Sequence, residues 1–185
     1  MSSAHPATTD TGRVPPDGFD VLDECHRQTL FALGKLAALV SRLVHIGADA
    51  EARTMAADVV RHFSVVVRSH HEDEERHVFP KLVAEGDEEV VKAVLRLQID
   101  HDWLEENWME LSPQLDAVAH GLSWYDLDVL QEAAKVFIAL SHDHMALEES
   151  FIYPQAKKHF DARDRIGMGR EMAARRREAR ARSPA

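Results

Sequence analysis

Two segments, one in each half of this chain, carry the same metal-capable residues at the same spacing. HHEDEERHVFP and HDHMALEESFIYP pair His70 with Glu74 and His144 with Glu148, and each segment ends in an aromatic residue and a proline. Residues four positions apart lie on one face of an α-helix, so each pair can direct a nitrogen and an oxygen to one place. The recurrence indicates an internal repeat.

A single histidine precedes each segment and extends the repeat: His26 in DECHRQTL and His101 in QIDHDWLEE. Four imidazoles and two carboxylates inside an apolar core would be costly to desolvate, and a bound cation removes that cost. A carboxylate can bridge two cations whereas a terminal imidazole binds one, so this set suggests a dinuclear centre with shared glutamates. Imidazole and carboxylate donors without thiolate suit iron, and also manganese or zinc.

The neighbouring residues leave a choice of register, because His71 and Glu75 have the same spacing as the first pair. The repeat favours His70, since Met145 stands at the position that matches His71. We therefore expect His71 to be a flanking residue, and Glu75 and its counterpart Glu149 either to support the ligands or to face solvent. Surface or packing roles are expected for six further histidines that have no match in the repeat: His45, His62, His77, His120, His142 and His159.

This chemistry requires long helices that bring the side chains together. Apolar residues recur at intervals of three and four, and each metal-capable residue falls within such a stripe. Gly47 and Gly121 are expected helix ends, Ser123 is an expected N-cap, and Pro80 should kink a helix or end its regular part. The expected helices cover about residues 19–47, 49–85, 87–119 and from 123 onward.

Short connections between long amphipathic helices favour antiparallel neighbours. The predicted fold class is all-α: an up-down-up-down antiparallel four-helix bundle with a short C-terminal extra helix. We expect a flexible N-terminal arm at residues 1–17, the bundle at 18–160 and a basic C-terminal helix or tail at 161–185.

Composition narrows the class of protein. The chain of 185 residues is 45% hydrophobic, enough for one buried core, and its net charge of −10 argues against nonspecific nucleic-acid binding. No stretch approaches the roughly 18 apolar residues of a membrane-spanning helix, and the N-terminus lacks the features of a secretion signal. We therefore expect a cytoplasmic protein with no nucleic-acid or membrane partner. Its single cysteine, Cys25, is either a redox-sensitive thiol or a buried inert one.

Taken together, the four histidines, the two glutamates and the EE-x-x-V-F-P and EE-x-x-I-Y-P runs resemble the hemerythrin-like, or HHE cation-binding, domain family over about residues 19–160. The resemblance implies a non-haem di-iron centre with two iron ions, with Glu74 and Glu148 as bridging carboxylates and a position for O₂ or a related ligand. Oxygen carriers of the family have a further histidine one turn after the third-helix histidine, where this chain has Glu105. Glu105 is therefore expected as an extra metal ligand, a pocket residue or a solvent-facing one.

Two functional classes remain open, and a protein that binds or senses O₂, NO or iron is favoured over a turnover enzyme. The alternative is a di-iron redox enzyme that consumes peroxide or NO, or repairs iron-sulfur clusters under oxidative or nitrosative stress. The sequence also looks like bacterial repair proteins of that kind, although the arm here lacks their cysteine. An enzyme would need an external reductant, because the sequence has no flavin, Cys₄ or dinucleotide motif.

Two further alternatives concern the bundle itself. Ferritin-like proteins place Glu before His at i, i+3, the opposite order to that found here. A purely structural bundle would fold without metal, with its buried histidines hydrogen-bonded to one another. We expect a monomer or a weak homo-oligomer.

Overall fold

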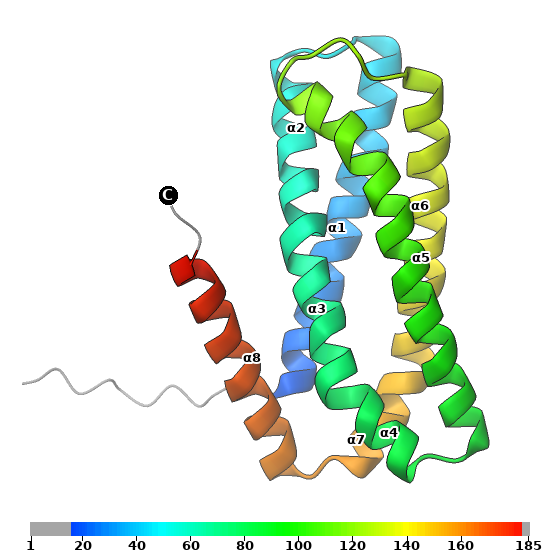
Figure 1. Ribbon diagram of the computed structural model, residues 1–185, viewed down its shortest axis with the longest axis vertical. Helices are drawn as coiled ribbons and strands as arrows, with labels where there is room; N and C mark the ends of the chain where they lie inside the picture. Colours follow the sequence, from blue (N-terminus) through cyan, green and yellow to red (C-terminus); the bar gives the residue numbers. More distant parts are fainter. Residues whose placement is uncertain (1–15, 183–185) are drawn as a thin grey trace, which may run out of the picture.

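The structure, a computed structural model, describes residues 16–182. Over this range the regular secondary structure is entirely helical, and four long helical runs lie side by side with one more helix beside them (Figure 1). The predicted all-α class and the helical bundle are thus confirmed. Most of the predicted N-terminal arm, and residues 183–185 of the tail, lie outside the described range.

Each of the four runs corresponds to one expected helix. The first is α1 (Gly18–His45), and the third is α5 (Glu88–Ala119). The second run is continuous from α2 (Ala50–Arg61) through η1 (His62–Val67), α3 (Arg68–Asp73) and η2 (Glu74–Val78) to α4 (Phe79–Glu85). The fourth comprises α6 (Leu127–Leu147), η3 (Glu148–Ile152) and α7 (Tyr153–His159), and α8 (Ala162–Arg182) follows it.

Aspartate side chains cap the start of every run, which corrects one prediction. Ser123 does not cap the fourth run; the carboxylate of Asp126 does so by accepting hydrogen bonds from the backbone N–H groups of Asp128 and Val129. The backbone N–H of Asp126 is itself bound by the side chain of Gln114, which fixes the later start. The other caps follow the same chemistry: Asp17, Asp49 and Asp87.

Glycines end the first and third runs, as predicted. Gly47 and Gly121 have φ angles of 98° and 68°, a conformation that glycine adopts without steric cost. The chain can therefore turn at once into short links, so consecutive runs lie beside each other.

A widened turn recurs in both halves of the repeat. The π-helical turns η2 and η3 begin at Glu74 and Glu148, whose carbonyls accept the N–H groups of Phe79 and Tyr153, five residues later. A proline follows each aromatic residue, and in a regular helix its ring would clash with the carbonyl four residues earlier. The wider turn accommodates this ring. The disturbance predicted at Pro80 is thus a change of helical type.

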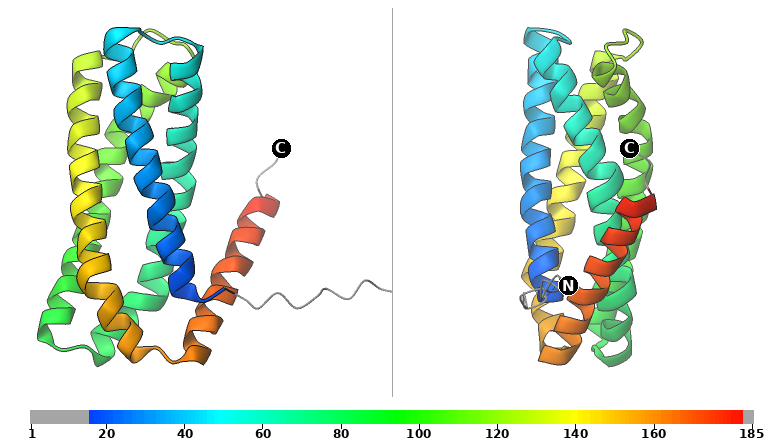
Figure 2. Two further views of the ribbon diagram at one scale, coloured as in Figure 1. Left: turned by 180° about the vertical axis from the view of Figure 1, so that it is seen from behind. Right: turned by 90° about the vertical axis from the view of Figure 1, so that its left-hand side faces the viewer.

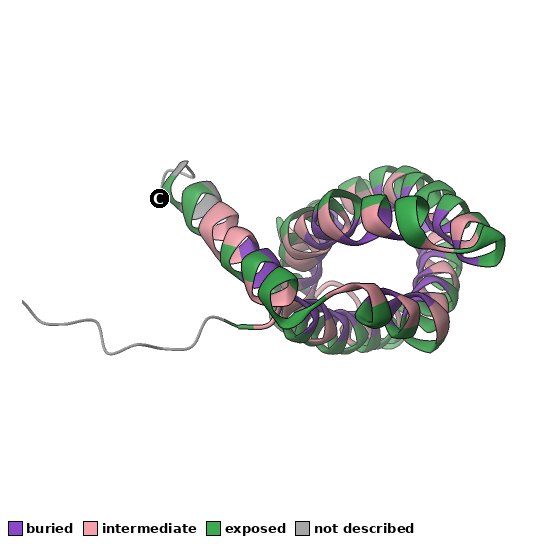
Figure 3. Ribbon diagram, turned by 90° about the horizontal axis from the view of Figure 1, so that it is seen from below, coloured by how far each residue is buried: buried purple, intermediate pink, exposed green. Residues whose placement is uncertain are grey.

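The core forms two apolar clusters with a polar layer between them. α1 and α5 each pack against α2 and α6, and buried residues line the inner faces of these helices (Figure 3). Along α1, His26 lies between Leu22 of one cluster, called the lower cluster here, and Leu33 of the other, the upper cluster. In the other three runs, too, buried polar residues lie between residues of the two clusters. The bundle therefore has a layer of buried polar side chains partway along its length.

The C-terminal helix α8 is longer than the short helix predicted, with 21 residues. It leaves the base of the bundle, packs against α1 and diverges towards its own end (Figure 2). Met168 and Met172 are buried in the lower apolar cluster, and the guanidinium groups of Arg175 and Arg176 reach the buried carboxylate of Asp73. Part of the basic charge at this end is therefore used within the chain. None of the helices in the described range is long and apolar enough to span a membrane.

Candidate metal centre

Six buried side chains meet in the polar layer, each at most 5% exposed. They come from α1, α3, α5 and α6 and from the first residues of the two widened turns. They are the six residues that the repeat singled out: His26, His70, Glu74, His101, His144 and Glu148.

Each glutamate lies between histidines of both halves of the chain. Oε2 of Glu74 is 3.4 Å from Nε2 of His70 and 3.5 Å from Nε2 of His101. Glu148 makes the matching contacts, 3.1 Å to the histidine of α6 and 3.2 Å to that of α1. Each carboxylate therefore connects one histidine pair to the other.

The donor atoms form two groups that share both glutamates. In one group the atoms of Glu74 and Glu148 lie within 4.8 Å of those of His26 and His70, and in the other within 4.8 Å of those of His101 and His144. Several of these buried atoms have no hydrogen-bond partner in the described chain, among them Oε2 of Glu74, both carboxylate oxygens of Glu148 and Nε2 of His101 and His144. Buried acceptors are costly when unpaired. A cation between them would satisfy them, so the donor set fits a metal.

Two carboxylates just outside the six-residue centre, those of Glu149 and Glu75, each orient one histidine of the centre, and we call them the outer carboxylates. Nδ1 of His26 donates to Glu149 at 2.9 Å, and Nδ1 of His101 donates to Glu75 at 2.8 Å. Such a bond fixes the tautomer, so that the lone pair of Nε2 faces the centre. Of the two roles expected for Glu75 and Glu149, the structure shows the supporting one.

One aromatic residue from each repeat packs on these same histidines. Tyr153 stacks on His26 with ring centroids 5.3 Å apart, and Phe79 stacks on His101 at 5.5 Å. The Tyr153 hydroxyl also donates to Oε1 of Glu74 at 2.6 Å and lies 3.2 Å from Nε2 of His26. Sequence reasoning treated Tyr153 only as the end of a motif. The difference between tyrosine and phenylalanine at matched positions was the available signal.

Without metal, the centre holds protons. Burial opposes a charge on His26, but the close contact with Glu148 and the charge of that carboxylate outweigh it and raise the pKa of His26 to about 9. Burial likewise opposes a charge on His101, but Glu148 and the other carboxylates raise its pKa to about 11. Burial and the charge of Glu148 raise the pKa of Glu74. Positive charge is thus stabilised where a cation would lie.

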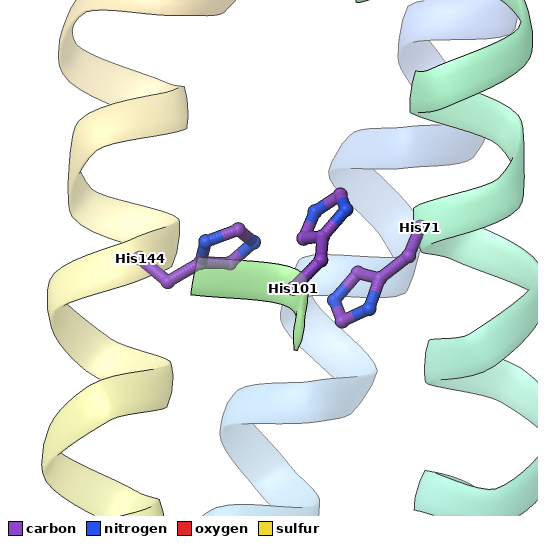
Figure 4. A group of neighbouring side chains, drawn as sticks. All are labelled: His71, His101 and His144. Atoms are coloured by element: carbon purple, nitrogen blue, oxygen red, sulfur yellow. The ribbon is translucent and has the colours of Figure 1, made fainter. Parts of the chain in front are cut away.

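His71 occupies a place that differs from the sequence prediction, whereas Glu105 takes one of its three expected roles, that of a pocket residue. His71 is more than a flanking residue: its ring stacks on that of His101 at 3.9 Å, and its nitrogen lies within 4.8 Å of donor atoms of His101 and His144 (Figure 4). Glu105 belongs to none of the donor groups. Its partly exposed carboxylate accepts a 2.8 Å hydrogen bond from Arg68.

A small cavity of about 30 Å³ adjoins the centre on the side of the upper apolar cluster. A water molecule needs about 10–15 Å³ by the same measure, so the cavity can hold one or two water-sized molecules. Histidines of the centre form part of its wall, and the Arg68–Glu105 pair forms another part. The rest of the wall is mainly apolar: Phe63, Val67, Leu104, Trp108, Phe137 and Met145.

Two other candidates in the described range lack the character of a functional site. Donor atoms of Asp73, His77 and Glu171 lie within 4.8 Å of one another, but Arg175 and Arg176 already neutralise Asp73. Burial raises the pKa of the Cys25 thiol to about 12, so this group is protonated at neutral pH. Of its two expected roles, the structure favours the inert one.

Comparison with known proteins agrees with this geometry. Residues 17–165 match the model of the hemerythrin HHE cation-binding domain. The chain is also 27% identical over 157 residues to a protein of Haemophilus influenzae that is named only as uncharacterized, an alignment covering 85% of this chain and 88% of that protein. With a domain match over most of its length and a His/Glu cluster inside a helical bundle, the chain belongs to the hemerythrin HHE cation-binding domain family.

Proposed function

We propose that residues 18–160 form an up-down-up-down antiparallel four-helix bundle that holds two non-haem iron ions and binds or senses O₂ or NO in the cytoplasm. The observation that carries this proposal is the position of Glu74 and Glu148, each between histidines of both halves. Carboxylates so placed suit a bridging role between two ions. Imidazole and carboxylate donors without thiolate suit iron.

The residues around the centre have separate roles in this proposal. His26 and His70 hold one ion, His101 and His144 hold the other, and the outer carboxylates keep their partner imidazoles in place. When bound, a pair of iron ions supplies a site where a diatomic ligand can attach or accept electrons. The apolar walls of the adjoining cavity limit water around such a ligand. Glu105 is left out of the ligand set because Arg68 holds its carboxylate.

The first test is the metal content and visible spectrum of aerobically purified protein, before and after anaerobic reduction and readmission of O₂. We expect about two irons per chain, held by the His/Glu donor set. A spectrum that returns reversibly with O₂ supports binding or sensing. Repeated turnover of peroxide or NO with an external reductant supports the redox-enzyme alternative.

Substitutions locate the iron. His70→Ala and His144→Ala should each lose at least one iron, while His142→Ala, an exposed residue on the same helix as His144, should keep both. Zinc or manganese in place of iron would contradict the iron assignment. Unchanged metal content in both site variants would contradict the centre itself.

A further inference from the structure

His71 has a position that the proposed ligand set does not use. It is half-buried and lines the cavity, and its ring lies against the rings of His101 and His144 (Figure 4). Within the described chain, no hydrogen bond or ion pair of His71 is found, in contrast to the outer-carboxylate bonds of His26 and His101. In the other half of the repeat its place is taken by Met145, so the feature belongs to one side of the centre.

The ring geometry argues against His71 as a third imidazole on the metal that His101 would hold. A metal bound to imidazole lies in the plane of the ring, along the lone pair of the nitrogen. The planes of His71 and His101 are only 12° from parallel, with centroids 3.9 Å apart. One ion cannot lie in both planes, and the hydrogen bond from His101 to Glu75 fixes which of the two rings faces the glutamates. His71 therefore covers the face of His101.

The wall of the cavity offers few other polar groups to a ligand. The hydroxyl of Ser141 donates to the carbonyl of Phe137, and that of Thr29 shares a hydrogen bond with His62. Arg68 and Glu105 pair with each other. Apart from the metal-binding histidines, His71 is the lining residue whose ring nitrogens are not engaged by any bond found among the described residues.

We propose that His71 is the hydrogen-bonding partner of a small exogenous ligand held in this cavity against the metal centre. The inference rests on the proposed function and adds which side chain contacts the ligand. A neutral imidazole carries one N–H donor and one acceptor nitrogen, so it can stabilise a bound diatomic molecule or a small anion whose outer atom carries partial negative charge. The apolar walls strengthen such a bond, because little water competes for it.

The test uses azide as the probe ligand, titrated into full-length, iron-loaded, oxidised protein and followed in the visible spectrum. His71→Met introduces methionine, the residue found at the matching position of the other repeat, and so removes the N–H donor of the ring. His71→Gln keeps an N–H donor, and His142→Met makes the same chemical change on the exposed face of α6.

We expect both His71 variants to retain the iron content of the unsubstituted protein. The azide dissociation constant should rise about tenfold in His71→Met, the loss of one hydrogen bond. It should stay within about threefold of the original in His71→Gln and be unchanged in His142→Met. Far-UV circular dichroism verifies that each variant is folded. If His71→Met does not fold, His71→Ala, which also lacks the ring donor, carries the test with the same expected rise in the azide dissociation constant.

Three results would overturn the inference while leaving the proposed function in place. Loss of iron in a folded His71 variant would make His71 a ligand. Equal azide affinity in His71→Met and the original protein would show that His71 makes no hydrogen bond to the ligand. An iron-loaded protein that gives no response to azide would show that the cavity does not open onto the metals. Failure of the original protein to bind iron would instead remove the proposed function, and this inference with it.

Discussion

The hydroxyl of Tyr153 donates a 2.6 Å hydrogen bond to Oε1 of Glu74, so a residue of the second half of the repeat holds the carboxylate of the first. Phe79 takes the corresponding place on the other side and has no hydroxyl. The two halves of the centre are otherwise closely matched in their stacking and in their outer carboxylates. One oxygen atom therefore makes the two glutamates unequal.

Tyr153→Phe should destabilise the metal-free protein by about 2 kcal/mol, because it leaves a buried carboxylate oxygen without its donor. Urea unfolding of the metal-free protein measures this change. Tyr125→Phe, the same substitution in the link before α6, is the control and should cost little. Equal unfolding curves for Tyr153→Phe and the original protein would show that the hydrogen bond contributes nothing.

The outer carboxylates should strengthen metal binding. Glu75→Ala and Glu149→Ala each remove the acceptor that orients a ligand imidazole, and we expect iron affinity to fall by about 10- to 100-fold in each. Competition with a chelator measures the affinity. Glu110→Ala, a substitution at an exposed residue of α5, is the control and should leave the iron affinity unchanged. An unchanged iron affinity in Glu75→Ala and Glu149→Ala as well would refute the orienting role.

Stability of the metal-free protein should fall as the pH rises. The pKa values of His26 and His101 are about 9 and about 11 in the folded chain, above the value of about 6.5 expected when it is unfolded. Their stabilisation is fully present below about pH 6.5 and is lost as the pH passes through 9 and then 11. Thermal unfolding between about pH 6.5 and 9.5 tests this. A midpoint that stays constant or rises would contradict it.

Metal binding should release protons for the same reason. At neutral pH the metal-free centre holds protons on His26 and His101, and both imidazoles must lose one to bind a metal through Nε2. Calorimetry of metal binding in buffers of different ionisation enthalpy should report about two to three protons released per chain at pH 7, one from each histidine and a part from Glu74, whose pKa is raised to about 7. Release of none would mean that these histidines are already neutral.

The buried carboxylate of Asp73 should anchor α8. Asp73→Asn leaves Arg175 and Arg176 without their buried counter-charge, which should lower the free energy of unfolding by about 3 kcal/mol. The adjacent Glu72 offers a matched control, because its contact with Arg175 is exposed and Glu72→Gln should cost less than about 1 kcal/mol. Similar losses in the two variants would mean that burial does not distinguish these pairs.

Much of this architecture was predictable from the sequence, because helical periodicity is a local property. The spacing of apolar residues predicted four long helices, and Gly47 and Gly121 marked two of their ends. The repeat also selected six residues that the structure brings together, since the offset between His and Glu sets the helical face they share. The predicted start of the fourth helix was wrong, because a hydrogen bond from the backbone of Asp126 to the side chain of Gln114, on the preceding helix, favours Asp126 over Ser123 as the N-cap.

The sequence by itself determined which residues lie on the inner face of each helix; the tertiary structure decided how those faces meet. Spacing could not show that Glu105 turns to Arg68, that His71 covers His101, or that α8 docks through Asp73. Each of these contacts depends on the rotation and offset of one helix against another. Those quantities are set by the packing of side chains from distant parts of the chain, which the periodicity of one segment does not contain.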